Sequence, residues 1–363
     1  MENRFIADII GRNVTHVTGF FSIHGDGAFL NGFGISNTAE DKNFTRLKYY
    51  WKNQKIPYVS SQAWRRWLRN NAVQVNGWEP SPLVAVLRNE KGNTSKIATN
   101  LDPIRCPEDD IFGYMFTSGK KEKEIQLRED LPEVQLVRTS PLRSSLLRAV
   151  PELTVTAVDE SFVHLPDDEP LAYKTEFSSG EFVATFSLDV YRLGVFEKKG
   201  NKQQELNPKL IEKYGDLLIK KEHPLYKEGN LVLMKNVTAV QNQRTIELLK
   251  ALVTLTGGAK MAQFGVDVSP KLLVLAGMTH GNMLFDDLLT SQDGKPALNI
   301  ALLKEVIEDF AEFIKTPVFI GIRESYLTNQ EEVRALHNTE INGIKIIVGT
   351  PKNIVEDFEK ELN

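Results

Sequence analysis

Residues 59–69 read Val-Ser-Ser-Gln-Ala-Trp-Arg-Arg-Trp-Leu-Arg. This pattern predicts a helix from about Gln62 to Val75 that begins after a serine N-cap. At helical spacing one face gathers apolar side chains that can dock against a sheet, namely Trp64, Trp67, Leu68 and Ala72. The other face gathers polar side chains one turn apart, namely Gln62, Arg65, Arg66 and Arg69. We therefore expect a helix that packs on a sheet and presents three guanidinium groups and an amide.

A basic and aromatic window surrounds this helix. Between Lys42 and Trp78 there are eight Lys or Arg residues and no Asp or Glu, although the whole chain has a formal net charge of −4. The same window holds Phe44, three tyrosines and all four tryptophans. Cationic side chains interleaved with aromatic rings suit phosphate neutralisation combined with base stacking. We interpret the tryptophans as packing residues and the arginines as RNA contacts.

The rest of the sequence mixes predicted strands and helices. Strands are expected at Phe5–Ser22, Asp110–Phe116, Leu272–Ala276, Pro317–Ile322 and Ile344–Gly349. Helices are expected at Gln241–Thr256, closed by Gly257-Gly258, at Ala301–Ile314, at Ile354–Leu362 and, briefly, between Val134 and Val150. The glycine-rich segment His24–Lys55 is expected to be irregular. Because strands and helices do not alternate strictly, we predict an α+β fold around one mainly antiparallel sheet.

A hairpin with a long acidic turn is predicted in the middle of the chain. Its outgoing strand is Leu153–Val158, and its return strand is Phe177–Leu193, where apolar residues alternate. Two polar segments, 76–109 and 198–230, are interpreted as insertions, the first because it is rich in Pro, Asn and Gly. The sequence therefore indicates one sheet with additions between its strands.

Composition indicates an ordinary globular protein. The chain is 41% hydrophobic and 25% charged, and no apolar run approaches the ~18 residues of a membrane span. The first residues become polar too soon for a secretory signal. Cys106 is the only cysteine, so an internal disulfide is excluded. We expect a reduced, cytoplasmic protein with no membrane partner.

Motifs for catalysis or cofactor binding are absent from the sequence. Gly32-Phe33-Gly34 does not open a helix after a strand, as a dinucleotide fingerprint would. No GxxxxGK[ST] phosphate loop occurs. The six histidines are scattered, without the spacing of a metal-binding pair. We therefore expect no enzyme activity, no cofactor and no metal, and Asp26 is the single catalytic candidate.

Four segments resemble, in the same order, the backbone subunits of CRISPR Cascade surveillance complexes. They are Val59–Arg69, Asp110–Met115, Glu176–Phe182 and Gly257–Phe264. The branch that they resemble is the DevR type of type I-B and I-A systems, within the RAMP superfamily. The resemblance implies a single domain over 1–363, a palm with a modified RNA-recognition (RRM, ferredoxin-like) fold. It also implies a finger-like insertion at 76–109, a thumb hairpin at 154–180 and a further insertion at 198–230.

The resemblance also implies a site and partners. The sugar-phosphate backbone of a guide RNA (crRNA) would contact Ser60, Gln62, Arg65, Arg66 and Arg69. Gly258, Ala259 and Lys260 would line the same channel, and we add His24, Phe177 and Ser178 as candidate RNA contacts. The implied partners are copies of the chain in a helical filament, other Cascade subunits, and target DNA paired to the guide in antiviral defence.

Two other functions remain as alternatives. The first is a metal-dependent endoribonuclease that uses Asp26, as loop acids do in related type III backbone subunits. The second is a transcriptional regulator, which would need a helix that reads duplex DNA, and no helix-turn-helix pattern is visible. RNA cleavage would favour the first, and equal affinity for single-stranded RNA and duplex DNA would favour the second.

Overall fold

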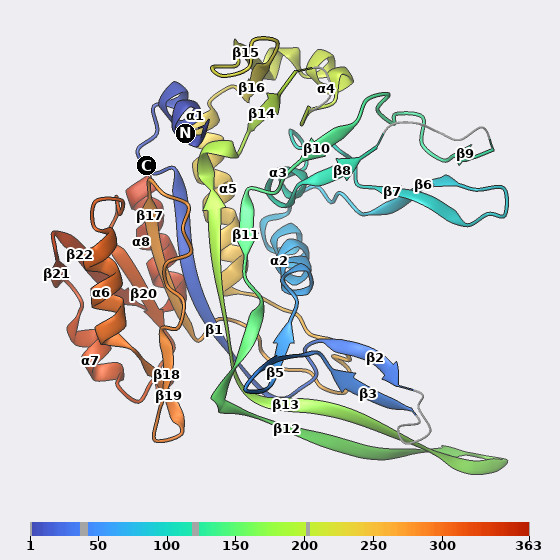
Figure 1. Ribbon diagram of the computed structural model, residues 1–363, viewed down its shortest axis with the longest axis vertical. Helices are drawn as coiled ribbons and strands as arrows, with labels where there is room; N and C mark the ends of the chain where they lie inside the picture. The colour runs from blue at the N-terminus through green and yellow to red at the C-terminus, as the bar shows by residue number, and fades with distance from the viewer. Residues whose placement is uncertain (1, 37–42, 118–122, 201–203, 363) are drawn as a thin grey trace.

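The computed structural model describes residues 2–36, 43–117, 123–200 and 204–362. Its centre is a twelve-stranded sheet whose main path runs in the order β21-β22-β20-β17-β1-β13-β12-β5-β4 (Figure 1). Most neighbours are antiparallel, and the parallel pairs are β20 (Val318–Ile322) with β22 (Ile344–Gly349) and β13 with β3. The predicted α+β class with a mainly antiparallel sheet is confirmed.

Helices cover both faces of this sheet. The central strand β1 (His16–Ala28) lies between β13 (Asp168–Asp189) and β17 (Leu272–Met278). Its side chains alternate, so Phe21 packs in one core and Phe20 in the other. The Phe21 core is covered by α2 (Ser61–Asn76), α5 (Val237–Val253) and α8 (Pro351–Leu362). The Phe20 core is covered by α6 (Ile300–Phe310) and α7 (Gln330–Ala335).

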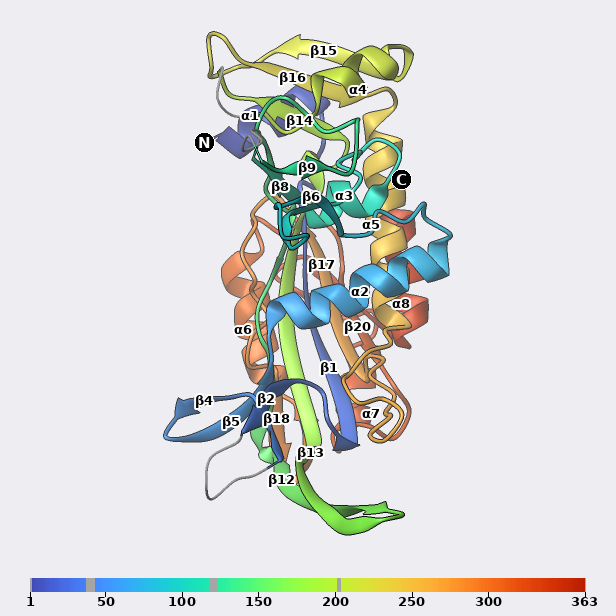
Figure 2. The ribbon, with the colours of Figure 1, turned by 90° about the vertical axis from the view of Figure 1, so that its right-hand side faces the viewer.

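A long two-stranded hairpin extends from the sheet. It consists of β12 (Leu147–Leu165) and β13, which pair antiparallel out to Val163 and Leu171 (Figures 1 and 2). Segment 154–180 lies in this hairpin. The predicted outgoing strand, Leu153–Val158, is confirmed and is longer at both ends, so most of the predicted acidic turn is strand. The return strand begins before Phe177, because residues of the predicted turn join it, and ends at Asp189, because Val190–Arg192 form a 3-10 helix. Large apolar side chains on it are exposed, including Val155 at 69% and Phe162 at 64%.

The N-terminal predictions were partly wrong. Phe5–Ser22 is not one strand, because α1 (Glu2–Ile10) comes first and Ile6 and Ala7 pack against Tyr191. The segment predicted to be irregular, His24–Lys55, is mostly strand. It contains the end of β1, then β2 (Gly32–Ser36), β3 (Phe44–Leu47), β4 (Tyr49–Lys52) and the start of β5 (Gln54–Val59). Its glycines lie within and between short strands and do not prevent pairing.

Two predictions in the middle of the chain also need correction. Asp110–Phe116 is not one strand: α3 (Pro107–Phe112) ends at Gly113, and only β8 (Tyr114–Phe116) is extended. Gly113 has φ +72°, a conformation that favours glycine and that separates the helix from the strand. The helix predicted between Val134 and Val150 is replaced by two short strands, β10 (Leu136–Arg138) and β11 (Leu142–Ser144).

The two predicted insertions contain regular structure. Segment 76–109, called here the finger segment, holds β6 (Val84–Arg88) and β7 (Thr94–Ala98), which are joined in a sheet by β9 (Ile125–Gln126). The described part of segment 198–230 holds α4 (Pro208–Lys213) and β15 (Leu218–Glu222), so it contains regular structure as well as loops. Strand β15 pairs with β16 (Asn230–Met234), which pairs with β14 (Val195–Lys198).

The C-terminal predictions were better. The strand, strand and helix expected after residue 317 are β20, β22 and α8, with the short β21 (Glu340–Ile341) ahead of β22. Helix α6 ends at Phe310, four residues before its predicted end, and α5 ends at Val253, before Gly257-Gly258. A small hairpin of β18 (Leu289–Gln292) and β19 (Lys295–Leu298) precedes α6.

Candidate nucleic-acid interface

Helix α2 forms as predicted, and the buried Trp64 side chain determines which face of the helix points toward the core. Ser60 is the N-cap, and its hydroxyl accepts a hydrogen bond from the Ala63 amide at 3.3 Å. The Trp64 side chain is fully buried, meets the Phe21 ring edge-on at 5.4 Å, and donates its indole N–H to the Ser145 carbonyl at 2.9 Å. A large aromatic side chain anchored at both ends holds the opposite face of α2 outward. Figure 2 shows α2 between the finger segment and the hairpin.

The four tryptophans do not all pack as predicted. Trp64 and Trp78 are buried and Trp67 is partly buried against the same core, so the packing interpretation is confirmed for these three. Trp51, on β4, is 73% exposed and contradicts it. Its place at the tip of a short hairpin leaves no core within reach. Lys42 of the basic window lies outside the described residues.

Arg65 and Arg66 carry positive charge without a carboxylate partner. Arg66 and Gln62 are exposed, whereas Arg65 is half-buried and donates to the Ser140 hydroxyl at 2.7 Å and to the Phe112 carbonyl at 3.4 Å. Both acceptors are neutral, and within the described ranges neither arginine forms an ion pair. Burial lowers the pKa of the Arg65 guanidinium from its usual value. A desolvated cation with neutral partners attracts an anion strongly.

Arg69 is bound differently from its neighbours. Its guanidinium forms an ion pair with the buried Glu108 of α3 and donates to the Ser81 carbonyl at 2.7 Å. The expectation of three presented guanidinium groups is therefore wrong for Arg69. The sequence concealed this partner because Glu108 lies 39 residues away and only the fold brings it to α2.

Three consecutive buried acids hold the end of α3 that faces α2. Glu108 binds Arg69, the Asp109 carboxylate accepts from the Ser81 hydroxyl at 2.7 Å, and Asp110 binds Arg138 and Arg244. Burial raises the pKa of Asp109. Glu108 and Asp109 thus both tie α3 to Ser81, and Asp110 ties it to β10 and α5; the sequence did not indicate these contacts because the partners are distant along the chain.

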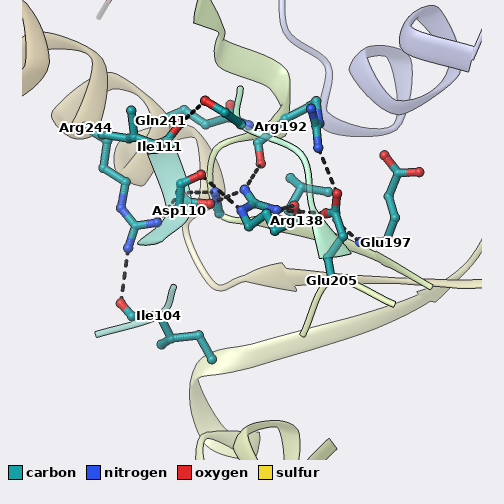
Figure 3. Close-up of polar contacts among 12 residues, drawn as sticks. Ile104, Asp110, Ile111, Arg138, Arg192, Glu197, Glu205, Gln241 and Arg244 are labelled. Carbon is teal, nitrogen blue, oxygen red and sulfur yellow. Dashed lines mark hydrogen bonds and ion pairs between the residues drawn. The ribbon is translucent and has the colours of Figure 1, made fainter. Parts of the chain in front are cut away.

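Figure 3 shows how Asp110 belongs to a larger buried network. Arg138 lies between Asp110 and Glu205, and it also donates to the Arg192 carbonyl at 3.0 Å. Burial lowers the pKa of Arg138, but the two carboxylates outweigh it and the pKa is raised. Arg244 of α5 completes the network by donating to the Ile104 carbonyl at 3.1 Å. The network fixes α3 relative to α5 and to β10.

A pocket of about 920 Å³ lies between α2 and the finger segment, and we call it the α2 pocket. One wall is the polar face of α2. The other parts come from the start of the finger segment, from α3 and from Ser140. Its lining residues are Gln62, Arg65, Arg66, Arg69, Asn70, Val73, Pro80, Ser81, Pro82, Leu83, Glu108, Phe112 and Ser140. Four of the five predicted phosphate-contacting residues thus line one pocket, with Ser60 at the start of the same helix.

The glycine-rich loop after α5 connects α2 with the base of the hairpin. A Cβ at Gly257 would lie 2.3 Å from the Trp67 ring, so only glycine fits there. Two residues on, the Ala259 amide donates to the Phe29 carbonyl at 2.9 Å. The Lys260 ammonium then donates to the Thr175 hydroxyl at 2.9 Å and lies 5.3 Å from the centre of the Phe29 ring. Gly258 adopts φ +124° between them.

The two candidate residues on β13, Phe177 and Ser178, differ in how far their side chains are exposed to solvent. Phe177 is partly exposed and stacks on Phe264, with 5.9 Å between ring centres. Ser178 is 1% exposed and donates to the Ala28 carbonyl at 3.4 Å. The Ser178 side chain therefore supports the hairpin from inside and has no free surface for a ligand.

His24 lies on the other face of the sheet. It pairs with Glu181 across β1 and β13, and its side chain follows Phe20 and Ser22, opposite to the face covered by α2. Its Nδ1 lies 2.6 Å from the buried Glu181 carboxylate, which also accepts from the Tyr326 hydroxyl. The structure therefore does not bring His24 to the α2 pocket. Asp26, two residues after His24 on β1, is exposed to solvent.

The described part of the chain has neither a cluster of metal-ligating side chains nor a membrane-spanning helix. Among the described residues, no three His, Cys, Asp or Glu side chains come together in an arrangement that could hold a metal ion. No helix in the described ranges is long and apolar enough to cross a bilayer.

Comparison with known proteins identifies a family. Residues 31–277 match the family model described as "CRISPR-associated negative auto-regulator DevR/Csa2". One chain of a solved "CRISPR RNA-guided surveillance complex, pre-nicking" is similar, with 12% identity, TM-score 0.52 and coverage of 96% of this chain and 100% of that one. A chain of a "CRISPR RNA-guided surveillance complex" gives 13% identity, TM-score 0.47 and coverage of 95% and 99%. No curated protein matches the sequence. Because the family model spans more than half of the chain, the protein belongs to the CRISPR-associated DevR/Csa2 family.

Proposed function

We propose that this protein is the non-catalytic, guide-RNA-binding backbone subunit of a Cascade surveillance complex. The observation that carries the proposal is Arg65, a half-buried guanidinium that lines the α2 pocket with only neutral hydrogen-bond partners. Such a charge is satisfied when an anion enters the pocket. RNA phosphate fits because guanidinium groups bind phosphate oxygens in pairs of hydrogen bonds.

The composition of the α2 face supports binding that is independent of RNA sequence. Arg66 and Gln62 are exposed one turn apart beside Arg65, and both suit contacts to phosphate and ribose. A subunit that accepts any guide needs such contacts, because base edges would restrict the guides it can hold. The exposed Trp51, at the turn of the β4–β5 hairpin that precedes α2, offers an additional aromatic surface.

The wider architecture supports a place in an assembly. In this proposal the central sheet and its helices form the RRM-like palm, and the β12–β13 hairpin is the thumb. Copies of the chain would stack along the guide, with other Cascade subunits at the ends and target DNA paired to the guide. The similarity to a chain of an RNA-guided surveillance complex and the exposed apolar residues of the hairpin support this arrangement.

The proposal is tested by fluorescence anisotropy of labelled single-stranded RNA over a salt series. Arg65→Ala and Arg66→Ala should each weaken binding and reduce the slope of log K against log salt by ~0.7 per lost phosphate contact. Arg323→Ala, an exposed arginine after β20, is the matched control and should change neither. Equal binding by wild type and both variants would refute the proposal, and equal affinity for duplex DNA would favour a regulator.

A further inference from the structure

The α2 pocket is larger and more apolar than a phosphate group requires. Its volume of about 920 Å³ lies at the upper end of the range of about 300–1,000 Å³ that small-molecule sites occupy. Only the α2 wall is cationic. The opposite side is formed by apolar residues, chiefly Pro80, Pro82 and Leu83, with Val73 and Phe112 between the walls. An anion bound at Arg65 would leave this apolar surface in contact with water.

The apolar wall of the α2 pocket is exposed to solvent at Leu83. The Leu83 side chain is 60% exposed, and the next residue, Val84, is 41% exposed. Within the pocket, the exposed Leu83 side chain and the Arg65 guanidinium offer two kinds of affinity, one for an apolar surface and one for an anion. The occupant that matches both has an anionic group joined to an apolar, flat surface.

The apolar wall is held at a fixed position relative to α2. The peptide of Ser81 is bound on both sides, because its amide donates to Glu108 and its carbonyl accepts from Arg69 at 2.7 Å. The buried Ser81 hydroxyl donates to Asp109 at 2.7 Å and accepts from the Asn100 amide at 2.7 Å. Pro80 and Pro82 flank this anchored residue and restrict its backbone further. The pocket is therefore preorganised before any ligand binds.

We propose that the α2 pocket binds a nucleobase of the guide strand, stacked against Leu83 and Pro82, while the adjoining phosphate binds Arg65. This inference rests on the proposed function and adds a base subsite to it. A nucleotide combines an anion with a flat apolar face, and stacking accepts any base because every base has such a face. The exposed amides of Gln62 and Asn70 lie on the polar wall, where they can meet the ribose.

The test compares two ligands and two variants by fluorescence anisotropy. The ligands are a labelled oligouridylate and a ribose-phosphate oligomer of the same length that lacks every base. Wild type should bind the oligouridylate more tightly. Leu83→Ala should weaken oligouridylate binding about fivefold, or about 1 kcal/mol, because it removes apolar surface that the base would cover, and should leave the base-free oligomer unaffected. Leu217→Ala, at a residue with 51% exposure outside the pocket, is the matched control.

The outcomes separate this inference from the function on which it rests. If Leu83→Ala weakens both ligands equally, or neither, the base subsite is refuted. Arg65→Ala should weaken both ligands in either case, so its failure would refute the phosphate contact instead. Labelled polyglutamate that binds the wild type, and loses affinity in Leu83→Ala, would assign the pocket to an acidic peptide and overturn the proposal. Thermal melting of each variant establishes that the exposed substitutions leave the fold intact.

Discussion

The guanidinium of Arg69 on α2 lies against the carboxylate of Glu108 on α3, and this ion pair joins the two helices across the floor of the α2 pocket. Glu108 is only 4% exposed, so its charge depends on Arg69 and on the Ser81 amide for compensation. The pair also holds the start of the finger segment in place through Ser81. Arg69 therefore positions the pocket, whereas Arg65 and Arg66 are available to a ligand.

Removing Arg69 should destabilise the protein. Arg69→Ala leaves Glu108 buried without its cation, which we expect to cost about 2–4 kcal/mol of unfolding free energy. Arg66→Ala, at an exposed position on the same helix, should change stability by less than about 0.5 kcal/mol. Urea denaturation measures both. The double variant Arg69→Ala/Glu108→Ala should lose less than the sum of the single losses, and strict additivity would contradict the pairing.

Gly257 should not tolerate even one methyl group. A Cβ there would lie 2.3 Å from the Trp67 ring, and that ring packs against the main core and has little room to move. We expect Gly257→Ala to cost about 1–3 kcal/mol by overpacking. Gly215→Ala is the control, because a Cβ at Gly215 meets nothing within 4 Å. Equal melting temperatures for the two variants would show that the loop does not contact α2 in solution.

Stability should fall in mild acid partly because of His16. Its side chain is 3% exposed, and burial, with smaller effects of Arg143 and His280, lowers its pKa from 6.5 to about 4. Since the folded pKa is below the unfolded one, the contribution is complete above pH 6.5 and is lost as the pH falls from 6.5 to about 4. The loss approaches about 3 kcal/mol.

The contribution of His16 to the pH dependence of stability can be measured by comparing wild type with a His16 variant. His16→Gln should flatten the dependence of unfolding free energy on pH between 6.5 and about 4, compared with wild type. The exposed His280→Gln is the matched control and should leave the wild-type slope nearly unchanged. If His16→Gln keeps the full slope, groups other than His16 cause the acid sensitivity.

The protein should leave RNA intact. Asp26 is exposed on β1, and the described residues around it include no group of three metal-ligating side chains. The proposal of a non-catalytic subunit predicts that labelled single-stranded RNA, incubated with the protein and Mg²⁺ or Mn²⁺, remains full length on a denaturing gel. Cleavage that disappears in Asp26→Asn would contradict the non-catalytic proposal and establish the endoribonuclease alternative. Asp216→Asn, at an exposed acid after α4, is the control.

The elements that the sequence predicted well carry their own local signals. Helix α2 has a serine cap and two faces, so it was found near its true ends. The alternating apolar residues located the return strand of the hairpin but not where it begins and ends. The strands after residue 24 were missed because their glycines imitate loops, and α3 was missed because an apolar run beside it imitates a strand. Short elements depend on tertiary pairing, which local patterns do not encode.

Local sequence patterns do not encode contacts between distant residues, and this also explains which predictions about the candidate site were correct. The face of α2 follows from helical spacing alone, so Arg65, Arg66 and Gln62 could be grouped on it. The pairing of Arg69 with Glu108 and the placement of His24 on the opposite face depend on contacts between distant parts of the chain. The apolar wall at Pro82 and Leu83 was equally invisible, since an exposed leucine in a proline-rich segment has no characteristic pattern.

The hairpin is built as a continuation of the central sheet, since β13 runs without interruption from the hairpin turn to Asp189 beside β1. The distance that the hairpin extends beyond the sheet therefore depends on the number of residues in its two strands. Each pair of residues added to both strands would lengthen it by ~6.8 Å and keep every side chain on its original face, because strand side chains repeat every two residues. Insertions in odd numbers would reverse the faces beyond them. Insertions or deletions of two residues in each strand can therefore change the length of the hairpin while the central sheet stays the same.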